Sequence, residues 1–402
     1  MTDPFRARVT GPLEPFAAGV AAELARQGFT PNSARQQMGL VAHLSGWLAA
    51  AGLSADALGA AVVERFCEAR RAAGYTNQRT ARALGPLLGY LRELGVVAPE
   101  PPPRPDGPAE ELLERFRRHL EIERGLVPAA ADGYVEKVRP FVDELAGPDG
   151  IDLAGFNGRA VIAFVTARCP RLGRAAARLT VTALRSLLGF LHLEGELQEA
   201  LADVVPSVAH PRLAGLPKRL EPAEVRALLD SCDRGTADGR RDFAILTVLA
   251  RLGLRAGEVA ALSFDDVDWR AGELVVRGKG RSERLPLPAD VGEAIVAYLR
   301  DGRPATVDGR AVFVRVKAPH RRVTSGAVIH VVAAAARRAG LGRVGAHRLR
   351  HTAATELLRA GADLPEVGQL LRHRRLATTA IYAKVDRDAL RQIARPWPEA
   401  RR

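Results

Sequence analysis

The chain has 402 residues, of which 47% are hydrophobic and 26% charged, and its formal net charge is +13. This composition excludes a disordered chain, a collagen, a coiled-coil rod and a small disulfide scaffold. At roughly 100–200 residues per domain, the length predicts two or three compact domains. The sequence has no apolar run of about 18 residues and no signal-peptide pattern, so we expect a cytoplasmic location and no membrane partner.

The cysteines and the charge narrow the class of protein further. Cys67, Cys169 and Cys232 are far apart and form no CxxC, which fits a reducing compartment and no zinc site. Residues 1–216 contain 24 basic and 24 acidic residues, whereas 217–402 contain 35 and 22. The whole positive excess therefore lies in the C-terminal part, which indicates a polyanionic partner. Alternatively, the excess charge only keeps the protein soluble or reflects a coding bias toward arginine.

Two proline-rich breaks divide the chain. Residues 99–108 (PEPPPRPDGP) contain six prolines and are typical of a semi-rigid linker. A second predicted linker, 206–219, holds three prolines and ends in Lys218-Arg219. We therefore expect an N-terminal segment 1–98, a middle segment 109–205 and a C-terminal segment 220–402.

The first two segments resemble each other. Residues 26–36 and 123–133 share a Gly and a Pro at an offset of 97, and 83–95 match 183–195 at seven of 13 positions. Leucines recur at helical spacing in both, as at Leu84, Leu87, Leu88 and Leu91. These patterns predict two copies of one bundle of about four helices, although Ala/Leu-rich helices also align by chance.

The C-terminal segment is predicted to be mostly helical with one small sheet. Leu274–Arg277 and Glu283–Leu287 are β-rich and flank a Gly-Lys-Gly turn, which indicates a hairpin. Helices are expected near Ala223–Cys232, Asp242–Leu252, Asp290–Leu299, Ser325–Ala339, Ala346–Ala360 and Leu364–Leu371. The expected fold class is mainly α, with a small antiparallel sheet.

The segment 346–385 carries the residues most suited to chemistry. His347, Arg350 and His351 are spaced i, i+3 and i+4, so on a helix they share one face. A zinc site is disfavoured because Arg348 stands where HExxH has Glu. Arg350 instead suggests a phosphate, which a guanidinium holds through two parallel hydrogen bonds. A solvated basic helix face is the alternative.

Four further residues extend this set. Arg255 lies at a Gly-bounded turn just before a helix that is expected near Gly257. Lys279 lies at the tip of the predicted hairpin, and Tyr382 follows His373 by nine residues.

These residues carry a resemblance to a known family. Residues 220–395 resemble the catalytic domain of the tyrosine recombinase (phage integrase) family, with GLRAGE, HRLRHTAATELLRAG and LLRHRRLATTAIYAKV as its boxes. All six catalytic-type positions are present in order. The resemblance implies that 109–205 is a helical, SAM-like core-binding domain and that 1–98 is an additional copy of it.

The resemblance also implies a reaction, the transesterification of a DNA phosphodiester through a 3′-phosphotyrosyl intermediate. Tyr382 would be the nucleophile, and Arg255 with Arg350 would hold the non-bridging oxygens of the phosphate. His347 would act as general base or hydrogen-bond partner of the nucleophile. Lys279 would protonate the leaving 5′-oxygen, and His373 would bond the scissile phosphate. No cofactor is expected, because the sequence has no GxxxxGK[ST] loop and no evident cluster of acidic Mg²⁺ ligands.

The expected partner is double-stranded DNA bearing a specific recombination site. We expect DNA contacts from a set of basic residues, Lys218, Arg219, Arg281, Arg348 and Arg372. Arg372 replaces the Gly that is commonest at this place in the family, and it could contact phosphate or alter the turn. The family implies a homo-tetramer on DNA, alone or with partner recombinases, in which the segment after Tyr382 docks on a neighbour. Docking of that segment on its own domain is the alternative.

Two other functions stay open at this stage. A type IB topoisomerase uses similar residues to nick and reseal one duplex, and it would not require two specific sites. A non-catalytic DNA-binding partner of a multi-recombinase element would have lost a catalytic residue, and none is lost here. The sequence does not distinguish whether the recombination serves integration, transposition or chromosome resolution.

Overall fold

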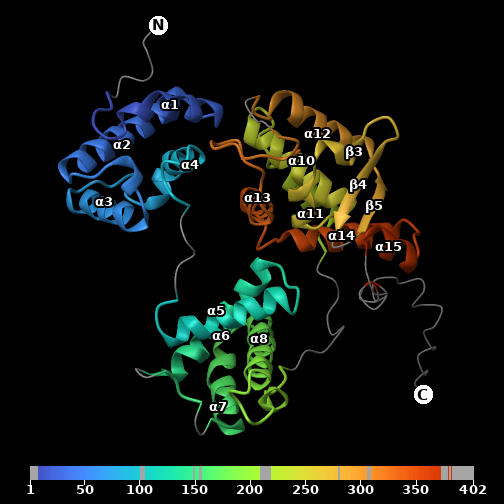
Figure 1. Cartoon of the computed structure of the whole chain (residues 1–402). Coiled ribbons are helices and arrows are strands. Elements are labelled where there is room, and N and C mark those ends of the chain that lie inside the picture. Colours follow the sequence, from blue (N-terminus) through green and yellow to red (C-terminus); the bar gives the residue numbers. More distant parts are fainter. Residues whose placement is uncertain are drawn as a thin grey trace, which may run out of the picture. The chain divides into compact units, whose positions relative to one another are not determined.

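A computed structural model of the chain describes residues 8–99, 105–147, 150–153, 156–208, 219–278, 281–305, 309–372, 379 and 382. The described residues are mostly helical (Figure 1). They also form one three-stranded and one two-stranded antiparallel sheet. The mainly α fold class with a small antiparallel sheet is therefore confirmed. The chain divides into two compact units, Met1–Glu100 together with Leu213–Arg402, and Pro101–Arg212. The division into three segments stays a prediction.

The first segment folds around its own apolar core. Its α-helices are α1 (Ala17–Arg26), α2 (Pro31–Ala50), α3 (Ala60–Ala72) and α4 (Gly85–Glu93). The leucines predicted from helical spacing are buried in this core. Gly28 leaves α1 with a φ of +80°, and Pro31 opens α2. A left-handed Gly after a helix and a Pro at the first helical position are the favoured stop and start signals.

The middle unit repeats this order of helices. It contains α5 (Pro108–Ile122), α6 (Pro128–Leu145), α7 (Gly158–Arg168) and α8 (Arg174–Leu193) around a separate apolar core. Gly125 has a φ of +60° and Pro128 opens α6, the same pair of signals as in the first segment. The sequence repeat thus marks equivalent helix boundaries. A short hairpin, β1 (Ala146–Gly147) with β2 (Gly150–Ile151), was not predicted.

The C-terminal segment is helical around the third core. Its helices are α9 (Pro222–Asp230), α10 (Ala237–Leu252), α11 (Ala256–Ala261), α12 (Ala289–Asp301), α13 (Ser325–Arg338), α14 (Ala346–Arg359) and α15 (Leu364–Leu370). Helix α10 is central, because it packs against α12, α13 and α14. It begins five residues before the predicted start, since the Thr236 hydroxyl accepts the Gly239 amide at 3.0 Å and caps the helix.

The predicted hairpin is present as part of a sheet. Strands β4 (Glu273–Gly278) and β5 (Arg281–Pro286) pair antiparallel with Gly278 opposite Arg281, and β3 (Val267–Asp268) adds to β4. Leu274 and Val276 alternate into the core while their neighbours face outward, which fixes the register. Within the described ranges, no helix is long and apolar enough to span a bilayer.

Candidate active site

Helix α14 presents the predicted His-Arg-His face. The His347 and His351 rings lie one helical turn apart, with their centroids 4.6 Å apart in an edge-to-face arrangement. His351 is partly buried and His347 is more exposed, and desolvation is the main reason why both pKa values lie below the ordinary value of histidine. The i, i+4 spacing of the sequence therefore produces a real pair, with Arg350 on the adjoining inner side.

Arg350 is the most deeply buried charged group of the site. Its side chain is 2% exposed, and its Nη1 donates to the Gly253 carbonyl at 2.6 Å. Its Nη2 donates to the Leu371 carbonyl. Burial, and then the charges of Arg255 and Arg372, lower the pKa of Arg350 to about 10, so the guanidinium stays protonated at neutral pH. These bonds tie α14 to the ends of α10 and α15.

The close packing around Arg350 depends on a glycine. Gly253 ends α10 with a φ of +57°, a left-handed conformation that glycine adopts without strain. A Cβ at this position would lie 2.9 Å from Leu371 Cδ2 and 3.3 Å from Ala353 Cβ. The first Gly of the GLRAGE box, Gly253, thus allows the close packing that brings its own carbonyl to Arg350.

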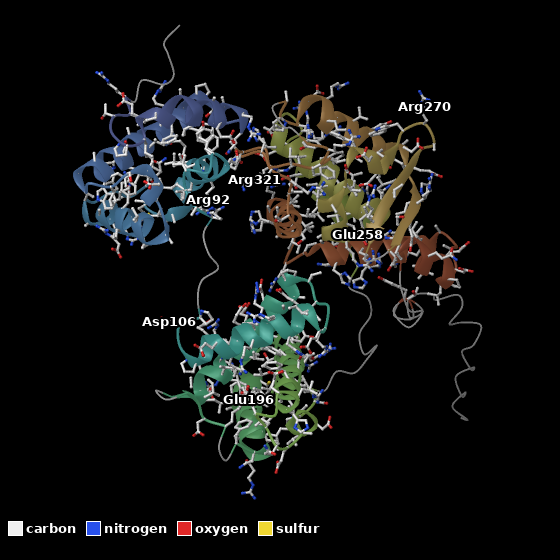
Figure 2. The ribbon with its side chains drawn as sticks, in the orientation of Figure 1. Arg92, Asp106, Glu196, Glu258, Arg270 and Arg321 are labelled. Atoms are coloured by element: carbon white, nitrogen blue, oxygen red, sulfur yellow. The ribbon has the colours of Figure 1, made fainter. Side chains whose placement is uncertain are left out.

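Arg255 stands at the start of α11, as predicted, with its side chain 49% exposed. Glu258 holds it at two points, since Glu258 Oε1 accepts Arg255 Nη1 at 2.6 Å and Oε2 accepts the Arg255 main-chain N–H at 2.7 Å. The second bond is half of a capping box, in which the third helical residue reaches back to the cap. Glu258, on α11, is labelled in Figure 2.

Arg372 directly follows the last turn of α15 and points inward. Its backbone has a φ of +54°, its side chain is 7% exposed, and its Nη2 lies 2.7 Å from Glu258 Oε2. Its Nη1 donates to the Leu370 carbonyl at 2.9 Å. The left-handed backbone explains why glycine suits this position, and the ion pair shows what the arginine contacts.

Tyr382 and His351 form the chemically distinctive contact of the site. The Tyr382 hydroxyl lies 2.8 Å from His351 Nδ1, and the tyrosine is almost fully buried. Burial raises the pKa of Tyr382 to about 12, against a smaller lowering by Arg350. Burial, followed by His347 and Arg350, lowers the pKa of His351 to about 4. At neutral pH a neutral phenol therefore faces a neutral imidazole, which can accept its hydrogen bond.

Sequence reasoning placed His351 on the right face but gave it no role. His347 was expected to act as general base or hydrogen-bond partner around the nucleophile. In the structure His351 contacts Tyr382, and His347 lies one turn nearer the start of α14. The available signal was the i, i+4 spacing of the two histidines. It could not tell which ring meets a tyrosine 31 residues away.

Several predicted residues cannot be placed. Lys218, Lys279 and His373 lie outside the described residues, and only the backbone of Arg281, at the first position of β5, is described. The two strands of the predicted hairpin, β4 and β5, are described and pair antiparallel.

Arg219 and Arg348 are placed, and they lie together. Arg348 Nη2 donates to the Arg219 carbonyl at 3.3 Å, and Arg219 pairs with Glu221 at 2.6 Å. Thr352 fixes the same region, because its hydroxyl accepts the Leu220 amide at 2.8 Å and donates to the Arg348 carbonyl. The two arginines thus join the start of the C-terminal segment to α14.

A buried tyrosine against a histidine, next to a cluster of arginines on a mainly helical scaffold, is an arrangement suited to the attack of a tyrosine on a phosphate ester. Comparisons with known proteins agree. Residues 218–388 match the phage integrase family. An integrase/recombinase of Sinorhizobium fredii, y4rA, is 38% identical over 96% of this chain and 95% of its own length.

Two further relatives extend the comparison. Tyrosine recombinase XerC of Oceanobacillus iheyensis is 31% identical over 70% of this chain and 94% of its own. The solved structure of the XerH site-specific recombinase bound to its palindromic difH substrate, a post-cleavage complex, covers 84% of this chain and 95% of that chain, with 21% identity and a TM-score of 0.55. That likeness supports the fold. The chain belongs to the phage integrase family, and it is a tyrosine-type site-specific recombinase.

Proposed function

We propose that this chain breaks and rejoins double-stranded DNA at specific sites through a 3′-phosphotyrosyl intermediate, without ATP or a metal ion. The observation that carries the proposal is the 2.8 Å contact between the Tyr382 hydroxyl and His351 Nδ1. It unites a nucleophile with an acceptor for its proton, beside the guanidinium of Arg350.

Cleavage begins when Tyr382 Oη attacks the scissile phosphorus and its proton passes to His351 Nδ1. The bond to the 5′-oxygen breaks, and Lys279 gives that oxygen a proton. The products are a 3′-phosphotyrosine and a free 5′-hydroxyl. The new ester keeps the energy of the old one, so a 5′-hydroxyl from a second duplex can reverse the step and rejoin the strands.

The arginines stabilise the charge that develops on the phosphate. Arg255 is half exposed at the start of α11 and can reach a bound backbone, whereas Arg350 supplies a fixed, buried cation. Each terminal nitrogen of Arg350 uses one N–H for a main-chain carbonyl and keeps a second N–H. His347 and His373 add hydrogen bonds to the phosphate oxygens. Preorganised cations of this kind commonly supply the largest share of catalysis.

The partner is a duplex that carries a recombination site. Lys218, Arg219, Arg281 and Arg348 contact its backbone, in keeping with the basic C-terminal part of the chain. The XerH complex on a palindromic substrate supports a symmetric assembly, and we propose a homo-tetramer on two sites. Access to such DNA fits the cytoplasmic location expected from the sequence.

The proposal is tested by trapping the covalent intermediate. A binding site is first selected from a randomised duplex pool and from DNA flanking the gene. The protein is then incubated with nicked versions of that site, in which the strand released by cleavage diffuses away, and the mixture is quenched with denaturant. The wild type should give a protein–DNA adduct linked through a 3′-phosphate.

Tyr382→Phe should give no adduct while still binding the duplex. Tyr298→Phe is the matched control, because it removes the hydroxyl of another buried tyrosine, one that stacks on Phe313 away from the site. An adduct that persists in Tyr382→Phe would remove Tyr382 as the nucleophile. Tight wild-type binding without any adduct would favour a non-catalytic partner. A topoisomerase would be favoured if the protein formed the adduct and relaxed single-site duplexes but did not rejoin strands between duplexes.

A further inference from the structure

We propose that Arg372 is a positioning residue that neutralises Glu258 and thereby leaves the positive charge of Arg255 available to the DNA phosphate. This inference rests on the proposed function. The sequence suggested a DNA contact for Arg372, but its guanidinium is nearly buried and pairs with Glu258 at 2.7 Å. The geometry therefore assigns it an indirect role.

Glu258 is the centre of a chain of contacts that joins the ends of two helices. Its carboxylate is 9% exposed and takes hydrogen bonds from the Arg255 side chain, the Arg255 main chain and Arg372. Burial would raise the pKa of Glu258, yet the Arg255 N–H and the nearby arginine charges outweigh it and lower that pKa. An ionised carboxylate thus lies directly behind the arginine that is proposed to meet the phosphate.

If Arg255 were its only counter-charge, the ionised carboxylate of Glu258 would cancel the positive charge of Arg255. With Arg372 present, the group formed by Arg255, Arg350, Arg372 and Glu258 has a formal charge of +2, and without Arg372 it has +1. The pentacovalent transition state carries one more negative charge than the diester, so the additional cation favours it over the ground state. Screening by water is weak because Glu258 and Arg372 are buried.

The backbone at this position makes the substitution to glycine informative. Arg372 has a φ of +54°, which glycine adopts more readily than arginine, so Arg372→Gly relieves local backbone strain while it removes the ion pair. The variant is therefore expected to keep the turn that follows α15, and a loss of activity would report the missing charge.

Adduct formation on the nicked duplex is the main measurement. Arg372→Gly should slow it about 10- to 100-fold, less than the loss of a direct oxyanion contact. Arg372→Lys should stay close to the wild type, because it keeps the charge. On a duplex whose scissile phosphate is replaced by a neutral methylphosphonate, the defect of Arg372→Gly should shrink towards onefold. A defect of equal size on both substrates would mean a structural role and would overturn the proposal.

The double variant Arg372→Gly with Glu258→Gln separates an indirect role from direct contact with DNA. Removing both charges restores the +2 of the group, so the double variant should be faster than Arg372→Gly alone. Arg372 Nε is buried and has no hydrogen-bond partner among the described residues, which makes a direct contact the natural alternative. If Arg372 touched the phosphate itself, Glu258→Gln would rescue nothing, and the proposal would fail.

A reaction-independent measurement completes the test. Urea unfolding of the wild type, the two single variants and the double variant forms a cycle, and the Arg372–Glu258 pair should show a favourable coupling well above experimental error. A coupling of zero overturns the inference. Absence of any wild-type adduct overturns the proposed function and this inference with it, whereas a wild-type adduct with an unchanged Arg372→Gly rate overturns the inference alone.

Discussion

Within the site, the hydroxyl of Tyr382 has His351 Nδ1 at hydrogen-bonding distance, and the two groups have pKa values displaced in opposite directions. Burial favours the neutral form of both, because each charged form would be poorly hydrated. The neutral pair suits the role proposed for Tyr382, that of a nucleophile that reacts only when a phosphate is bound.

The displaced pKa of His351 makes a prediction about stability. In the unfolded chain histidine titrates near 6.5, and in the folded chain His351 titrates near 4. Between these pH values the unfolded state binds more protons, so the free energy of unfolding falls as the pH drops from about 6.5 towards 4. His351→Gln lacks this loss and should therefore be less acid-sensitive over that window.

Urea unfolding at a series of pH values between 4 and 8 measures the difference. We expect the wild type to lose about 1–2 kcal/mol more than His351→Gln, less than the full pKa shift would give because the ring is only partly buried. Above pH 6.5 the two curves should run parallel. Parallel curves across the whole range would contradict a buried, neutral His351.

At the scale of elements, the site exists because the ends of α10 and α15 meet α14. The α10 terminus supplies the Gly253 carbonyl, α14 supplies Arg350, and the segment after α15 supplies the Leu371 carbonyl. Buried donors and acceptors are costly when unpaired, so these bonds fix the helix ends relative to one another as well as the guanidinium.

Gly253→Ala tests this junction. The new methyl group would meet Leu371 and Ala353 closely, in a backbone conformation that alanine adopts with strain. We expect a loss of about 2–4 kcal/mol in the free energy of unfolding, together with a slower rate of adduct formation as Arg350 shifts.

Gly340→Ala is the matched control. Gly340 also follows a helix with a left-handed φ, of +68°, but a Cβ there would meet nothing within 4 Å. It should cost only the backbone strain, about 1 kcal/mol, and leave the adduct rate unchanged. Equal losses in the two variants would show that steric contact at Gly253 does not matter.

Local sequence signals located most of these elements. Helices α13, α14 and α15 begin at the predicted residues, because caps, prolines and apolar spacing act over a few residues. The hairpin was also found, and its third strand was missed because two residues carry no periodicity. Helix α10 begins earlier than predicted because its start depends on a single capping residue, Thr236.

At the scale of the whole molecule, charge and architecture are divided along the chain. The segment with residues 1–216 is electrically balanced, and several of its arginines are already paired, as Arg71 is with Glu64 and Arg117 with Asp132. The excess lies in the segment that holds the site. Binding to the DNA backbone should therefore depend mainly on the C-terminal residues.

The salt dependence of duplex binding measures this division. Lys218→Gln with Arg281→Gln should reduce the slope of log affinity against log salt concentration by about 1–2, as expected for one or two lost phosphate contacts. Arg71→Gln with Arg117→Gln removes the same number of charges from the balanced segment and should leave the slope unchanged. Equal reductions in slope would mean that DNA contacts are spread over the chain.

The sequence by itself determined the mainly helical fold and the repeated helix order, and it supplied the residues proposed for the site, because these depend on local spacing and on residue type. The tertiary structure decided which of these residues touch. His351 meets Tyr382 across 31 residues, Arg350 meets Gly253 across 97, and Arg372 meets Glu258 across 114. No local pattern encodes such pairings, since they follow from how the helix ends pack around a shared core.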